Sequence, residues 1–177
     1  DRTMGIFERM PEAFHDKLDA EFSFASPRRH GFDTVNAIRA MRDSKVRVFM
    51  AMGGNFIRAT PDSAVTEDAL RNTELTVQVS TKLNKSHLVH GRRALILPAL
   101  GRTDRDTQAS GDQRVTVEDS MSAVHASQGR LDPPGPEVRS EVAIVCELAE
   151  RLFAGENAPF RANAPQLDWI ACRADYS

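Results

Sequence analysis

The sequence predicts an α/β protein built on an open, mostly parallel Rossmann-like sheet with helices on both faces. Short apolar, β-branched runs typical of buried strands occur at residues 46–52, 75–79 and 93–98. Helical segments separate these runs, and a polar turn follows each of them directly. Strands joined by helices of this length pair in parallel through right-handed crossovers, so an open parallel sheet is expected.

The helices are expected where apolar residues recur every three or four positions. These segments are residues 11–22, 33–43, 61–72 and 141–153, with a brief helix that ends before Gly91. Ser140 can cap the last of them, which has the clearest apolar pattern. We expect its apolar stripe to be buried, namely Ile144, Val145, Leu148 and Leu152.

The segments after residue 98 are less regular. We expect an exposed polar loop over 103–111, a short fourth strand over 114–118 and a connector over 131–136, where three prolines lack an amide proton. The chain is therefore divided into a Rossmann-like lobe over residues 1–155 and an irregular carboxyl-terminal tail over residues 156–177, which leads to a further domain.

Composition and charge exclude several classes of protein. The 177 residues, 41% hydrophobic and 27% charged, are typical of one soluble domain with a buried core. The formal net charge of -2 gives no broad footprint for nucleic acid or an anionic membrane, and no apolar run approaches the roughly 20 residues of a membrane helix.

The number of cysteines indicates the cellular compartment, and the first residues indicate whether the chain was processed. Two cysteines allow neither a disulfide framework nor a four-thiolate cluster within the chain, so a reducing, cytoplasmic location is expected. The chain starts at Asp1 without a leader of the secretory kind, and we expect that upstream residues were removed.

The polar turns after the three strands are the candidate binding site. They comprise Gly53, Gly54, Asn55 and Thr60, then Ser80, Thr81, Lys82, Asn84, Ser86 and His87, then Gly101, Arg102, Thr103 and Asp104. Carboxyl ends of parallel strands share one edge of a sheet, and glycines there let backbone amides approach a phosphate. A nucleotide or another phosphorylated organic ligand is expected. The alternative is that the glycines only make turns and the hydroxyls only cap helices.

Other motifs do not indicate chemistry carried out by this chain. The dinucleotide fingerprint G-x-G-x-x-G and the P-loop are both absent. His87 and His90 lack a third metal ligand at suitable spacing, and no nucleophile elbow surrounds the serines near His125. Cys146 lies in an apolar helix and is expected to pack in the core. No catalytic and no metal-ligating residue is predicted.

Several stretches resemble one known family. They are VFMAMGGNFIRATPD (48–62), LTVQVSTKLNKSHLVHGRRALILPALGRTDRD (75–106) and VTVEDSMSAVHASQGRL (115–131), supported by HGFDTVNAIRAMRD (30–43) and RSEVAIVCELA (139–149). Together they resemble the central part of the formate-dehydrogenase-like molybdopterin oxidoreductases (alpha subunit). The resemblance covers most of the chain.

The resemblance implies a cofactor and a role for each turn. In that family molybdenum or tungsten is held by two molybdopterin guanine dinucleotides, a bis(molybdopterin guanine dinucleotide), and two Rossmann-like lobes each grip one of them. This chain looks like the second lobe. By resemblance, Gly53, Gly54, Asn55 and Thr60 would meet the guanosine diphosphate part, while the turn over 80–87 and the turn over 101–104 would line the rest.

The chain also departs from the family pattern. Many members carry an aspartate after the second strand, where Val79 and Ser80 stand here. The family's iron–sulfur cysteines, metal-ligating residue and cofactor-capping domain have no counterpart, so we expect no redox activity and no retained cofactor from the chain alone. The expected partners are the remaining domains of the parent chain, with self-association of the isolated lobe.

A different class of function stays open. The same fold would also serve as a stand-alone nucleotide- or protein-binding module without redox activity, because a fold alone does not fix a function. A hydrolase or metal enzyme using His87, His90 or His125 is the least favoured alternative.

Overall fold

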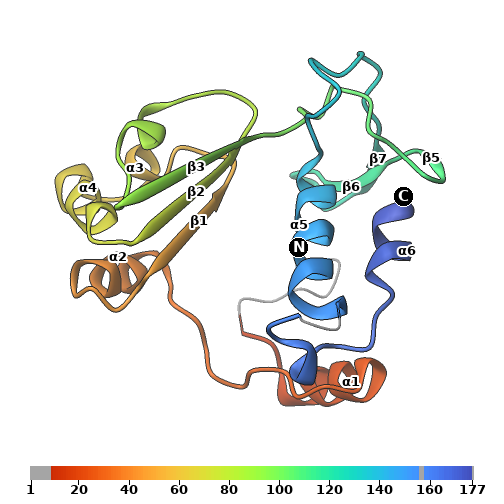
Figure 1. The fold of residues 1–177 in the computed structure, drawn as a ribbon, viewed down its shortest axis with the longest axis horizontal. Helices are drawn as coiled ribbons and strands as arrows, with labels where there is room; N and C mark the ends of the chain where they lie inside the picture. Colours follow the sequence, from red (N-terminus) through yellow and green to blue (C-terminus); the bar gives the residue numbers. More distant parts are fainter. Residues whose placement is uncertain (1–8, 156–157, 177) are drawn as a thin grey trace. The chain divides into compact units, whose positions relative to one another are not determined.

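The computed structural model describes residues 9–155 and 158–176, so the expectation about the amino terminus lies outside the described residues. Contacts divide the chain into two compact units (Figure 1). The first unit is the continuous segment Gly31–Ala99. The second combines Asp1–His30 with Leu100–Ser177. The predicted lobe over residues 1–155 therefore contains the whole first unit and part of the second. The predicted boundary at residue 155 stays a prediction.

The first unit contains a three-stranded parallel sheet, and the predicted α/β class is confirmed. Strands β1 (Val48–Met52), β2 (Leu75–Ser80) and β3 (Arg93–Pro98) lie in the order β1-β2-β3. Met50 lies opposite Val77, and Val77 lies opposite Leu95. Because consecutive parallel strands need a crossover connection, the helical segments between them are required by this topology.

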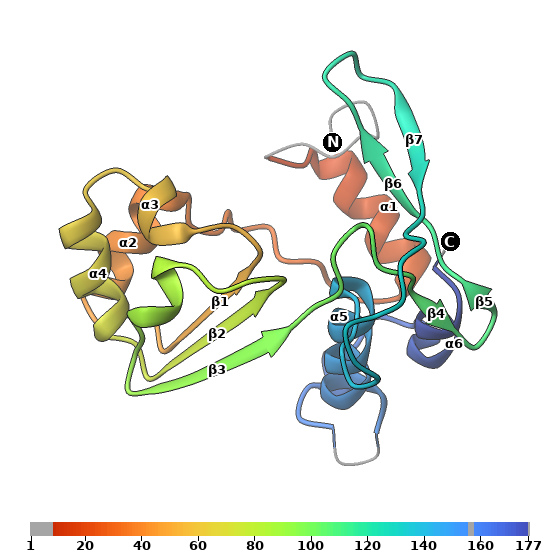
Figure 2. The same ribbon diagram turned by 90° about the horizontal axis from the view of Figure 1, so that it is seen from above.

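Three helices of this unit pack on one face of the sheet. They are α2 (Thr34–Arg42), α3 (Phe56–Ala59) and α4 (Ser63–Arg71), and the 3₁₀ helix η2 (Lys85–Leu88) connects β2 to β3. Figures 1 and 2 both show α2, α3 and α4 on the same side of the strands. The side chains of Asp33 and Asp62 accept backbone N–H groups at the starts of α2 and α4, which fixes where these helices begin.

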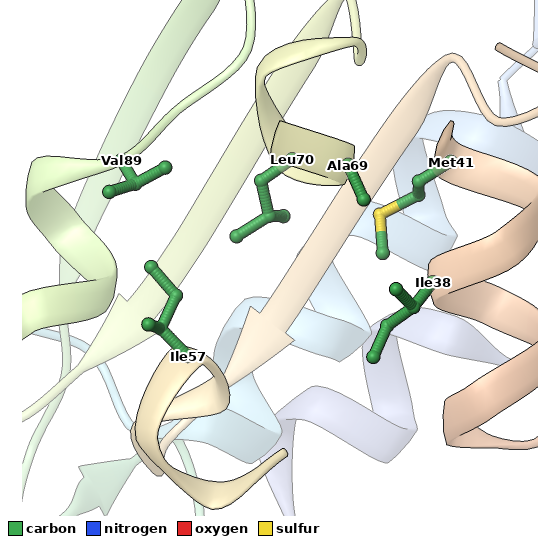
Figure 3. Packing of buried hydrophobic residues seen from close by; sticks show 6 residues of the cluster. All are labelled: Ile38, Met41, Ile57, Ala69, Leu70 and Val89. Carbon is green, nitrogen blue, oxygen red and sulfur yellow. The ribbon is translucent and has the colours of Figure 1, made fainter. Parts of the chain in front are cut away.

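The core of the first unit lies between these helices and the sheet. Ile38, Met41, Ile57, Ala69, Leu70 and Val89 form its buried cluster, and their side chains gather in one space (Figure 3). Ile57 and Leu70 are completely inaccessible to solvent. Burying each such side chain stabilises the fold by about 1.5–3 kcal/mol. The short helix α3, which the sequence pattern did not predict, is therefore anchored by Ile57.

The opposite face of the sheet is covered by no helix of residues 31–99. Side chains alternate along a strand, so Val48, Met50 and Met52 lie on this face, and the register adds Val77 and Leu95. Met50 and Leu95 on the outer strands are 40% and 46% exposed, whereas Val77 on the central strand is buried at 9%. The sequence predicted helices on both faces of the sheet. The helices within residues 31–99 cover one of these faces.

The second unit is made of helices and two small antiparallel hairpins. Its elements are α1 (Glu12–Phe22), β4 (Thr107–Gln108), β5 (Gly111–Asp112), β6 (Val115–Glu118), β7 (Val124–Ser127), α5 (Glu141–Ala149), the π-helical turn η3 (Glu150–Ala154), η4 (Arg161–Asn163) and α6 (Trp169–Ala174). The predicted fourth strand is β6, which pairs with β7 in a hairpin of its own. The predicted loop over residues 103–111 contains β4, paired with β5.

The buried face of α5 differs from the one predicted. Val145 and Leu148 are 47% and 41% exposed, whereas Ala143 and Ala149 are buried. The helix is apolar on most sides, so its pattern alone does not determine which side packs within the unit. The tail that was expected to be irregular contains α6, where the Asp168 carboxylate accepts the backbone N–H of Ala171. None of the helices in the described part of the chain has the length and apolar character needed to cross a membrane.

Candidate functional site

Two glycines end β1 and expose their backbone. The Gly53 N–H donates to the Val79 carbonyl at 2.7 Å, which continues the parallel ladder by one bond. Gly53 and Gly54 both have φ of 67°, a left-handed conformation that other residues adopt only with strain. Apart from its two chain neighbours, no described residue has an atom within 4 Å of the position that a Cβ of Gly54 would occupy. The backbone at this turn is therefore open to close approach by a ligand.

The turn after β1 is joined to the turn after β2 by side-chain hydrogen bonds. The Asn84 side-chain amide donates to the Gly54 carbonyl at 2.7 Å. The Ser86 hydroxyl donates to the Asn55 side-chain oxygen at 2.8 Å and accepts the Ile57 N–H at 3.1 Å. Ser86 is buried. These contacts bring two of the three predicted turns together at the carboxyl edge of the sheet, and we call this pair of turns the rim.

A buried imidazole nitrogen lies within the rim. The Asn84 N–H donates to His87 Nδ1 at 3.0 Å, and the Asn84 carbonyl lies 3.3 Å from the same nitrogen. In the neutral tautomer in which Nδ1 accepts, the ring proton is on Nε2. The Nε2 atom is buried and has no hydrogen-bond partner among the described residues. A buried donor without an acceptor is costly, so an acceptor atom that reached His87 Nε2 would remove this cost.

The other predicted rim residues fall into two groups. The Thr60 hydroxyl contacts that of Thr66 at 3.0 Å, and the Ser80 hydroxyl donates to the Lys82 carbonyl at 2.8 Å, so these hydroxyls shape the loops themselves. The side chains of Thr81 and Lys82 are exposed at the tip of the second turn. They are the ones available to an incoming anionic group.

The third predicted turn belongs to the second unit. The Gly101 N–H donates to the Asp104 carboxylate at 2.7 Å, and the Asp104 N–H donates to the Gly101 carbonyl at 3.0 Å. A pocket of about 160 Å³ is lined by Gly101, Arg102 and Asp104 together with Gly129 and the start of α5. A Cβ on Gly129 would collide with the Asp104 backbone, which explains the glycine there. That this turn shares an edge with the rim stays a prediction.

The residues named for the less favoured chemistries have other neighbours in the described part of the chain. In the described residues there is no group of three or more His, Cys, Asp or Glu able to hold a metal ion. His90 Nδ1 contacts the Gly91 carbonyl at 2.6 Å. Burial raises the pKa of the Cys146 thiol, and the nearby Cys172 adds to this, so Cys146 is a poor nucleophile at neutral pH.

One polar pair was missed by sequence reasoning. His125 Nε2 lies 2.6 Å from the Asp119 carboxylate across the hairpin of β6 and β7. The same carboxylate accepts the backbone N–H groups of Met121 and Ala123. The hydrogen bond from His125, followed by those from the backbone, lowers the pKa of Asp119. Both side chains are exposed, so we interpret this pair as a contact that holds the turn between β6 and β7. The sequence feature that could have predicted it is an aspartate and a histidine on either side of a short turn.

The sheet and its glycine turn define a protein of Rossmann-like α/β type, and comparisons relate it to longer proteins. No family model matches the chain. It is 65% identical over 171 residues to an "Uncharacterized oxidoreductase" of Mycobacterium tuberculosis and, equally, to one of Mycobacterium bovis, covering 96% of this chain and 22% of each relative. It is 42% identical over 150 residues to "Protein YdeP" of Escherichia coli K12, covering 85% of this chain and 20% of that protein. The chain thus spans about a fifth of the length of these curated relatives.

Proposed function

We propose that this chain is one part of a larger molybdopterin-dependent oxidoreductase of the formate-dehydrogenase-like kind, in which it helps to bind a molybdopterin guanine dinucleotide. The observation that carries the proposal is the rim, where an open glycine backbone, an unsatisfied imidazole N–H and an exposed lysine come from two adjacent strand ends. The name of the mycobacterial relatives and the share of their length that this chain spans support a part of an oxidoreductase.

The residues at the rim suit the phosphate and nucleotide portions of such a cofactor. The backbone N–H of Gly54 can approach a phosphate oxygen because no side chain stands over this residue, whereas the Gly53 N–H is bonded to the Val79 carbonyl. Lys82 supplies positive charge, and His87 Nε2 supplies a donor. When bound, the cofactor would supply the metal that exchanges electrons with the substrate, and the role of this chain would be to orient the dinucleotide.

Base recognition must differ from that of family members with an aspartate after the second strand. The Ser80 hydroxyl donates to the Lys82 carbonyl, and the residue is buried and uncharged, so it is a poorer acceptor for guanine or ribose than an exposed carboxylate would be. The Asn55 side-chain oxygen already accepts the Ser86 hydroxyl. Thr81 is the nearest exposed polar side chain, and we expect any contact to the nucleoside at this position to involve it.

The test is made in a full-length polypeptide that carries this chain. Asparagine tolerates positive φ, so Gly54→Asn keeps the turn and adds a side chain over the open backbone. We expect it to abolish the guanine nucleotide that acid treatment releases and the molybdenum or tungsten measured by mass spectrometry. Gly31→Asn is the matched control, because Gly31 also has open space around it and lies outside the rim. Cofactor content equal to wild type in Gly54→Asn would refute the assignment.

A binding module without redox activity is the second candidate. It is favoured by the fact that every contact forming the rim lies within residues 31–99. The two candidates differ in the affinity of the 177-residue chain for GDP. As part of an enzyme, the chain would supply only some of the contacts to the cofactor and should bind GDP weakly. Submicromolar binding in titration calorimetry would favour the module.

A further inference from the structure

A buried glutamine lies in the central strand beneath the rim. Gln78 belongs to β2, and the register places Ala51 of β1 and Ile96 of β3 directly opposite it. Phe49, two residues before Ala51, packs against the buried cluster, so these side chains lie on the face that the helices cover. Gln78 is 6% exposed. A buried amide beside apolar neighbours is costly unless it is hydrogen-bonded, so its partner indicates its role.

The partner of Gln78 is the short helix that carries the second turn of the rim. The Gln78 side-chain nitrogen Nε2 donates to the Ser86 carbonyl at 3.3 Å, and both residues are buried. Ser86 lies in η2, and the last carbonyls of a helix receive no donor from the helix itself. Gln78 therefore supplies a donor to this helix from inside the sheet.

Ser86 connects this buried amide to both turns of the rim. The Ser86 N–H donates to the Asn84 side-chain oxygen at 2.9 Å, and the Asn84 side-chain nitrogen donates to the Gly54 carbonyl at 2.7 Å. The Ser86 hydroxyl donates to the Asn55 side-chain oxygen at 2.8 Å. The carbonyl, the N–H and the hydroxyl of one residue thus join the interior of the sheet to the first turn and to the second.

The Gly54 peptide is the part of the rim that depends most on such support. Glycine restricts its own backbone less than any other residue, so the hydrogen bonds that Gly54 makes determine how its peptide is oriented. One of these bonds comes from Asn84, whose side chain is oriented in turn by the Ser86 N–H. Removing the donor of Gln78 would release Ser86 and, through Asn84, the Gly54 peptide.

We propose that Gln78 is a positioning residue for the cofactor site, because its side-chain amide fixes Ser86 and thereby holds Asn84 and Gly54 in the arrangement that receives a phosphate. Gln78 is buried beneath the rim, so it acts through Ser86 and not by contact with the ligand. The inference rests on the proposed function where it concerns the cofactor, and on the hydrogen bonds alone where it concerns the two turns.

Gln78→Met tests the proposal in the full-length polypeptide, because methionine has a similar length and volume but no donor. Thr76→Val is the matched control. Thr76 is buried on the same face of β2, and its hydroxyl lies 3.5 Å from the Arg93 carbonyl at the amino end of β3. Each substitution removes one side-chain contact to a backbone carbonyl, but only Gln78→Met removes one that reaches the rim.

The first measurement is hydrogen exchange in cofactor-free protein, on peptides that contain the Ile57 and Ser86 amides. We expect Gln78→Met to raise these exchange rates about tenfold, and Thr76→Val to leave them within about twofold of wild type. Peptides from α4 report whether the first unit is folded. Equal exchange at the rim in the two variants would overturn the proposal.

The second measurement is the rate at which cofactor-loaded protein loses its molybdenum or tungsten on warming, read by mass spectrometry. We expect this loss to be about tenfold faster in Gln78→Met than in Thr76→Val. An unchanged rate in Gln78→Met, with cofactor abolished in Gly54→Asn, would overturn the positioning role alone. Unchanged cofactor in both Gln78→Met and Gly54→Asn would refute the proposed function, and the exchange rates would still decide whether Gln78 holds the two turns.

Gln78→Glu provides a pH profile that a purely structural role would not produce. A protonated carboxyl can donate to the Ser86 carbonyl as the amide does, whereas a carboxylate only accepts. Exchange at the rim should be as slow as in wild type at acidic pH, and should approach that of Gln78→Met as the pH rises. Fast exchange at every pH, with α4 still protected, would contradict the proposal. This variant also decides the question if Gln78→Met does not fold.

Discussion

Replacing Ser86 by alanine tests whether this hydroxyl holds the rim together. Ser86 is 1% exposed, and its hydroxyl makes two hydrogen bonds to the turn after β1. The substitution leaves the buried Ile57 N–H without an acceptor, at a cost of about 1–3 kcal/mol, and removes the neutral bond to Asn55, worth about 1 kcal/mol. The free energy of unfolding of the first unit should therefore fall by about 2–4 kcal/mol.

Hydrogen exchange measured on peptides from β1 and β2 gives this free energy for the first unit separately from the second. The matched control is Thr81→Ala, an exposed position on the same turn, which should change the value by no more than about 0.5 kcal/mol. If Ser86→Ala behaved like Thr81→Ala, the hydroxyl would not connect the two turns, and the geometry of the rim would be wrong.

Three further predictions follow from local contacts. Gly91→Ala should destabilise the first unit by about 1–3 kcal/mol or more in urea denaturation, because the new methyl group would collide with Thr73, whereas Gly31→Ala should have little effect. The Lys85 ammonium lies 2.5 Å from the Glu67 carboxylate and lowers the pKa of that carboxyl. The stability that this ion pair adds is present above the ordinary pKa of glutamate, about 4.3, and is lost as the pH falls through the lowered pKa. Glu67→Gln should therefore reduce the loss of folding stability between these pH values in an acid titration. Thr81→Val together with Lys82→Gln should reduce the nucleotide content of the full-length protein while leaving the stability of the first unit unchanged, and a loss of both would assign these side chains to folding.

The elements of the first unit were largely predictable because their signals are local. The helices predicted over residues 33–43 and 61–72 are α2 and α4, with Asp33 and Asp62 as their N-caps, and the β-branched runs form β1, β2 and β3. The short helix α3 was not predicted because four residues are too few for a periodic pattern, and its stability comes from the tertiary burial of Ile57.

The second unit shows where pattern reasoning fails. The helix α5 is apolar on several sides, so the sequence indicated a buried stripe containing Val145 and Leu148, and both are exposed. Strands β4 and β5 have two residues each, which is below the length at which alternation is recognisable. The ends of such elements depend on contacts that no local spacing reports.

The candidate site was predictable in composition but not in the role of each residue. Polar turns after parallel strands predicted a ligand edge, and the bond from Asn84 to Gly54 joins two of these turns there. The sequence did not distinguish residues that build the rim, such as Asn84 and Ser86, from residues left exposed on it, such as Lys82. That distinction depends on burial and on hydrogen-bond partners far apart in the chain.

A structure of the full-length protein with its cofactor tests the central claim most directly. We expect density for a diphosphate within about 3 Å of the backbone nitrogen of Gly54, with an acceptor atom at a similar distance from His87 Nε2. Cofactor bound elsewhere, with these two turns facing solvent, would contradict the proposed function.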